Sequence, residues 1–127
     1  MKAGVALAGA LTLAGCYELE EPVRPIASWV VTFEGSGTAL DPGGARVVEA
    51  AAGVARAVPD GKVTVEPYAA SRAGQANQIE TRLRAQAVAN GLVARGVAKE
   101  RVAIRPKTAF GADPEVESRR VEIVIGR

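Results

Sequence analysis

The chain offers few residues from which a catalytic or metal site can be built. It has 127 residues, one Cys and no His, so a Ser-His-Asp triad, a Cys-His pair and a Cys/His zinc site are excluded. Asp113, Glu115 and Glu117 offer the oxygen ligands that Ca²⁺ prefers. Their spacing lacks a central Gly, however, and indicates a solvated loop. The sequence therefore predicts no catalytic residue, no metal ion and no cofactor.

The single cysteine, Cys16, carries the one covalent chemistry that the sequence suggests. It follows Leu-Ala-Gly, and this pattern resembles the bacterial lipobox, in which the thiol becomes a thioether-linked diacylglycerol. Lys2 and the uncharged residues 5–13 are typical of a signal peptide and too short to span a bilayer. We expect residues 1–15 to be removed and Cys16 to be lipidated; the alternative is an ordinary N-terminal core segment. Tyr17 is not the Asp that favours inner-membrane retention, so the outer membrane is the predicted location.

Charge is distributed unevenly along the chain. Residues 16–66 contain eight acidic and four basic residues, a net charge of −4, whereas residues 69–107 contain eight basic and two acidic residues, a net charge of +6. A basic stretch suits an anionic partner, although at this length it is most often a solvated helix face. The chain has one Trp, two Tyr and two Phe, which is too few to suggest a base-stacking platform. No nucleic-acid partner is predicted.

Hydrophobic periodicity predicts the elements that position these residues. Alternating β-branched residues indicate strands over residues 28–33, 62–66, 101–105 and 119–125. One helix is expected after the N-cap Asp41 and another over residues 75–95, with Ile79, Leu83, Val88 and Leu92 as its apolar positions. Loops are expected over residues 67–74 and 106–118.

The predicted order β-α-β-α-β-β favours an α+β fold, a two-layer sandwich in which a mixed four-stranded sheet carries both helices on one face. Residues 28–127 form this domain in the predicted organisation. Residues 16–27, which are polar and contain Pro, are expected to be a tether between the lipid and the domain.

Three blocks of sequence resemble OmpA-like domains. Residues 77–88 (NQIETRLRAQAV) are similar to the family's helix pattern N-x-x-L-S-x-x-R-A-x-x-V, and residues 119–123 (RRVEI) to its closing strand. Residues 31–40 (VTFEGSGTAL) resemble the opening strand and loop. With a lipobox before them, the three blocks resemble the peptidoglycan-associated lipoprotein type of this family.

The resemblance implies a periplasmic domain that binds peptidoglycan without being an enzyme. In the family, an Asp in a G-H-T-D segment and the Arg of the R-A pair hold meso-diaminopimelate, and opposite charges suit such a zwitterion. The Arg corresponds to Arg84, and the Asn that opens the helix pattern corresponds to Asn77. The alternative for Arg84 is a surface arginine paired with Glu80 one turn earlier.

The acidic half of the family's ligand site is missing from this chain. The Asp position falls on Ala69, or on Ala70 if the loop is one residue shorter. Glu66 lies nearby in sequence, but as a strand residue we expect it to face solvent rather than to replace the Asp. Two hypotheses follow: weak peptidoglycan binding that links the wall to the outer membrane, or a lipid-anchored scaffold that presents its basic helix to a periplasmic protein partner.

Overall fold

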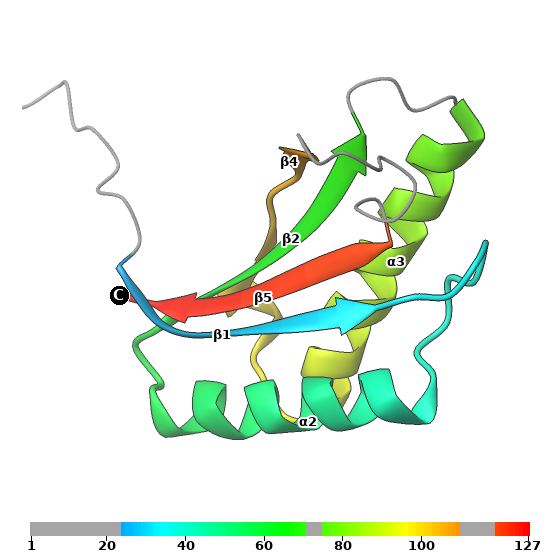
Figure 1. The fold of residues 1–127 in the computed structure, drawn as a ribbon. Coiled ribbons are helices and arrows are strands. Elements are labelled where there is room, and N and C mark those ends of the chain that lie inside the picture. Colours follow the sequence, from blue (N-terminus) through cyan, green and yellow to red (C-terminus); the bar gives the residue numbers. More distant parts are fainter. Residues whose placement is uncertain (1–23, 71–74, 110–118) are drawn as a thin grey trace, which may run out of the picture.

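The alternating stretches pair into one mixed sheet, and both helices pack on one of its faces (Figure 1). The computed structural model describes residues 24–70, 75–109 and 119–127. In sequence order, its elements are β1 (Pro25–Thr32), α2 (Pro42–Ala57), β2 (Lys62–Ala70), α3 (Gln75–Ala94), the 3₁₀ turn η2 (Lys99–Arg101), β3 (Val102–Ile104), β4 (Lys107–Ala109) and β5 (Arg120–Gly126).

The sheet is four strands wide. β5 lies between β1 and β2 and is antiparallel to both, while β3 and β4 follow one another along the other edge of β2, parallel to it. The predicted fold class, an α+β sandwich with a mixed four-stranded sheet, is confirmed. None of the helices in the described part of the chain is long and apolar enough to cross a membrane.

The core lies between the sheet and the helices. Val121, Ile123 and Ile125 of β5 are buried as the alternation predicts, and they pack with inward residues of α2 and α3. Burying a side chain of this size contributes about 1.5 to 3 kcal/mol. Phe33, which follows β1, is also buried, and Trp29 of β1 packs against the same core.

Both helices begin or end where local chemistry predicts. The Asp41 carboxylate accepts a hydrogen bond from the backbone N–H of Gly44 at 2.6 Å, and Pro42 is the first residue of α2. At the other end, the guanidinium of Arg101 donates to the carbonyls of Ala55 and Val58, which also accept backbone hydrogen bonds from Val58 and Gly61. Gly96 follows α3 with a φ of 93°, the left-handed conformation that favours Gly after a helix.

Strand pairing over long sequence distances extends the strands beyond their predicted bounds. β1 begins at Pro25, which pairs with Gly126, so the expected tether over residues 16–27 overlaps the first strand. β2 continues to Ala70 rather than ending at Glu66, and Lys107–Ala109 forms β4 within a predicted loop. The end of β2 and β4 pair with each other. Neither segment can be recognised as a strand from its local sequence, because its pairing partner is distant in the chain.

Helix α3 is rotated differently from the prediction. Val88 and Leu92 are fully buried, but Ile79 and Leu83 are about half exposed. Thr81, Arg84 and Ala85 occupy the inward positions of that part of the helix instead. Prediction from apolar residues alone was wrong here because the helix turns an arginine toward the domain.

Candidate functional site

Arg84 lies under the loop that joins β1 to α2 and is 1% exposed. Its Nε donates a hydrogen bond to the carbonyl of Gly37 at 2.8 Å, and its Nη2 donates to the carbonyl of Gly35 at 2.7 Å. The centre of the guanidinium is 5.7 Å from the centroid of the Phe33 ring, within range of a cation–π contact. The loop, the first strand and α3 therefore meet at this side chain.

The loop over residues 34–38 owes its shape to two glycines. Gly35 has a φ of 56°, a backbone conformation that residues other than Gly rarely adopt. A Cβ at Gly37 would lie 3.0 Å from the carbonyl oxygen of Glu34, which accepts a hydrogen bond from the Gly37 N–H at 2.9 Å. This tight turn directs two backbone carbonyls at Arg84.

Two arginines, Arg84 and Arg119, lie close enough at this end of the sheet for the charge of one to affect the pKa of the other. Burial lowers the pKa of Arg84; the carboxylate of Glu80 opposes that effect and the charge of Arg119 adds to it. The carbonyl of Arg119 accepts a hydrogen bond from the N–H of Phe33 at 2.9 Å, which fixes its backbone beside the Arg84 loop. A buried cation with a second cation nearby is an arrangement that attracts an anionic group.

The two sequence-based alternatives for Arg84 are both incomplete. Arg84 does pair with Glu80, with 3.7 Å between Nη2 and the carboxylate oxygen Oε2, but the expectation of a surface arginine was wrong. The loop carbonyls, not Glu80, give Arg84 its shortest contacts among those described above. The positions of these glycine carbonyls depend on tertiary structure.

The remaining site candidates lie at the same end of the sheet. Asn77 is in the first turn of α3, and Ala69 and Ala70 end β2, paired with Thr108 and Ala109 of β4. β1 and β2 both run toward this end, while β5 starts from it. The fold therefore places the backbone of Asn77, Ala69 and Ala70 at the same end of the sheet as the Arg84 loop. The position where the family has an Asp holds Ala in this chain.

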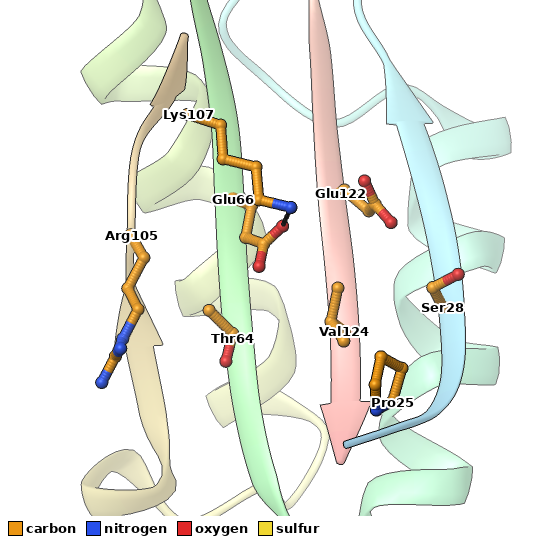
Figure 2. Close-up of a pocket in the computed structure, with 8 residues that line it drawn as sticks. All are labelled: Pro25, Ser28, Thr64, Glu66, Arg105, Lys107, Glu122 and Val124. Atoms are coloured by element: carbon orange, nitrogen blue, oxygen red, sulfur yellow. Dashed lines mark ion pairs between the residues drawn. The ribbon is translucent and has the colours of Figure 1, made fainter. Parts of the chain in front are cut away.

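Glu66 does not replace the missing Asp. It lies on the helix-free face of the sheet (Figure 2), whereas its neighbours Val65 and Pro67 are fully buried. Its carboxylate is 2.7 Å from the ammonium of Lys107. Its position agrees with the expectation that it does not replace the Asp, but the expectation that it faces solvent was wrong, since it is only 9% exposed. Strand alternation directs Glu66 away from the face on which Arg84 lies.

Arg119 is a site residue that sequence reasoning missed. In the sequence, Arg119 is only the first residue of the closing strand pattern. The signal that identifies it, the pairing of Arg119 with Phe33, joins residues far apart in the chain. The expected lipidation site, Cys16, and the acidic cluster at 113, 115 and 117 lie outside the described residues.

Comparisons with known proteins agree with this fold. The profile of the OmpA family matches residues 32–123. The peptidoglycan-binding protein ArfA of Mycobacterium tuberculosis is 31% identical over 119 residues, covering 87% of this chain and 36% of ArfA. This chain thus spans about a third of the length of that curated relative.

Solved structures give the same architecture at low sequence identity. The peptidoglycan-associated lipoprotein of Burkholderia pseudomallei superposes with a TM-score of 0.65 at 20% identity, covering 84% of this chain and 98% of that one. The OmpA-like domain of FopA1 from Francisella tularensis gives a TM-score of 0.64 at 20% identity, covering 76% of this chain and 70% of that one. From the profile match across most of the chain and the shared sheet and helix arrangement, we conclude that this protein belongs to the OmpA family.

Proposed function

We propose that this domain binds the peptide stem of peptidoglycan non-covalently at the Arg84 end of the sheet. The observation that carries the proposal is the buried guanidinium of Arg84, held beneath a glycine loop with a second cation, Arg119, nearby. Two relatives support it by name: ArfA is a peptidoglycan-binding protein, and the Burkholderia protein is a peptidoglycan-associated lipoprotein. The proposed activity is binding, with no reaction catalysed.

The proposed ligand contact is a carboxylate of diaminopimelate on Arg84. Guanidinium is a planar donor that matches a carboxylate geometrically. Two of its donors are directed at loop carbonyls, so a ligand carboxylate replaces these carbonyls as acceptors, or shares the donors with them, as the exposed loop adjusts. Asn77 is the second proposed contact. At Ala69 or Ala70 no carboxylate receives the ligand's ammonium group.

Binding is expected to be weak. A hydrogen bond to a charged group contributes about 1.5 to 3 kcal/mol, and each 1.4 kcal/mol changes affinity about tenfold. The missing Asp therefore weakens binding about ten- to a hundredfold compared with a complete site.

Co-sedimentation of the protein with purified sacculi tests the proposal. Arg84→Ala should abolish binding, whereas Arg82→Ala, which removes an exposed arginine from the same helix, should preserve it. Ala69→Asp or Ala70→Asp should strengthen binding, and free meso-diaminopimelate should compete. Wild-type protein that stays in the supernatant, or a folded Arg84→Ala variant that sediments like wild type, would contradict peptidoglycan binding at this site.

We also propose that the domain links the wall to the outer membrane through a lipid on Cys16. β1 starts at Pro25 and runs toward the Arg84 loop (Figure 1), so the segment from Cys16 enters the domain at the end opposite to Arg84. A strand of eight residues spans about 26 Å at roughly 3.3 Å per residue. The distance between the two ends of β1 suits a domain that is attached to a membrane at one end and to peptidoglycan at the other.

A second candidate function is a lipid-anchored scaffold that has lost peptidoglycan binding. The observation that favours it is the outer surface of α3, where Ile79 and Leu83 are about half exposed. A groove of about 590 Å³ lies between α3 and β3, lined partly by Val93 and Ile104. Exposed basic residues at 82 and 99 border this region, so the matching partner is an amphipathic segment with acidic flanks. Leu83→Asp should abolish complex formation with such a partner and leave sacculus binding unchanged.

A further inference from the structure

The helix-free face of the sheet contains a pocket of about 370 Å³ (Figure 2). Thr64, Glu66 and Val124 are 5%, 9% and 8% exposed, although α2 and α3 both pack on the other face. Arg105 and Lys107, from the edge of the sheet, also line the pocket and are exposed. This part of the face is therefore hollow, with a buried carboxylate in its floor and cations at its rim.

Two carboxylates lie next to each other in this pocket. Glu66 of β2 and Glu122 of β5 are direct partners in the antiparallel register, where like charges destabilise a sheet. Glu66 is compensated by the ammonium of Lys107 at 2.7 Å. Glu122 accepts a hydrogen bond from the Tyr68 hydroxyl, also at 2.7 Å. One carboxylate is thus matched by a cation and the other by a neutral phenol.

This arrangement leaves room for a ligand that carries both charges. A carboxylate has about four acceptor positions, so Glu122 can receive an ammonium group in addition to the Tyr68 hydroxyl. The Lys107 side chain is 50% exposed, and its ammonium group has three donors, so it can also receive a ligand carboxylate while it keeps its contact with Glu66. Pocket volumes from about 300 Å³ upward are typical of small-molecule sites.

We propose that this pocket binds a small zwitterion, such as an amino acid or a short free peptide. The ammonium group of the ligand lies at Glu122, and its carboxylate lies at Lys107. The proposal does not depend on peptidoglycan binding at Arg84, which lies on the other face of the sheet. Free peptides and stem-peptide ends in the wall share this chemistry.

Nuclear magnetic resonance titration with glycylglycine tests the site, using the full chain with Cys16→Ser in detergent. We expect saturable shifts of the amides of Thr64–Glu66 and Glu122–Val124 and a Kd of about 1 mM, which corresponds to about −4.1 kcal/mol. N-acetylglycylglycine lacks the ammonium group and glycylglycine amide lacks the carboxylate, so each should bind at least about tenfold more weakly. Equal binding of the blocked peptides, or no shift at these amides, would overturn the proposal.

Matched variants separate this site from the rest of the domain. Glu122→Gln keeps the Glu66–Lys107 pair and should weaken glycylglycine about tenfold, the loss of about 1.4 kcal/mol. Glu49→Gln removes the same charge from an exposed position on α2 and should bind like wild type. A folded Glu122→Gln variant that binds glycylglycine with wild-type affinity would contradict a zwitterion site at Glu122. If purified sacculi compete with glycylglycine, the ligand of this pocket is a wall peptide. If they do not compete, the ligand is a free peptide or amino acid.

Discussion

At the scale of single residues, tertiary partners determine what each charged side chain does. Arg84 and Glu66 lie on opposite faces of the sheet, and each is buried. Arg84 binds two loop carbonyls, whereas Glu66 pairs with Lys107. An arginine that positions a loop can also present its charge to a ligand, because the loop that covers it is exposed.

Tyr68 gives a pH-dependent test of the helix-free face. Its pKa is raised above 10.0, chiefly by its hydrogen bond to Glu122, with burial and the charge of Glu122 acting in the same direction. Because the folded state favours the protonated phenol, Tyr68 contributes to the free energy of unfolding below pH 10.0. This contribution is lost as the pH rises through the folded-state pKa.

We expect Glu122→Gln to lower the pKa of Tyr68 toward 10.0, because it removes the carboxylate that disfavours a second negative charge. Tyrosinate ultraviolet absorbance measures it, with Tyr17→Phe in both proteins so that Tyr68 is the remaining tyrosine. Glu49→Gln is the control. An unchanged alkaline midpoint in Glu122→Gln would show that the hydrogen bond is absent in solution.

At the scale of elements, the close approach of α3 to α2 depends on a glycine. A Cβ at Gly91 would lie 3.1 Å from both Val48 Cγ1 and Leu40 Cδ1. Gly53 of α2, in contrast, has open space around it, with its nearest contact the flexible end of Arg56 at 3.8 Å. The same residue type therefore has a packing role at position 91 and none at position 53.

Two substitutions should change stability in opposite directions. Gly91→Val is expected to destabilise the domain by about 1 to 3 kcal/mol, since overpacking forces neighbours to shift. Gly53→Ala should stabilise it by about 0.4 to 1 kcal/mol, because it restricts the unfolded chain at a helical position. Urea unfolding measures both. If Gly91→Val unfolded at the wild-type urea midpoint, the two helices would not pack as closely as described.

At the scale of the whole molecule, the proposed membrane and wall attachments lie at opposite ends of the sheet. β1 connects the two ends, and its N-terminal neighbour Arg24 exchanges backbone hydrogen bonds with Arg127. The first strand is thereby fastened to the C-terminal end of β5. A load between lipid and wall would act along these paired strands.

The lipid anchor predicts a specific labelling pattern. Cells that express the wild-type chain should incorporate radiolabelled fatty acid into it, whereas Cys16→Ser should remove both the label and membrane retention. Two or three acyl chains exceed what stable anchoring requires, at about 0.8 kcal/mol per buried methylene. Equal label in both proteins would exclude a lipid on Cys16, and the folded domain should bind sacculi equally well with or without it.

The sequence by itself determined the fold class and the order of the main elements, and it selected Arg84 as a candidate binding residue. These follow from local signals: alternation in β5, the Asp41 cap of α2, Gly96 after α3, and a short pattern around Arg84. Tertiary structure alone decided that β2 extends to Ala70, that β4 exists and that Glu66 faces away from Arg84. Each of these depends on pairing or packing between residues distant in the chain, and local periodicity contains no information about such partners.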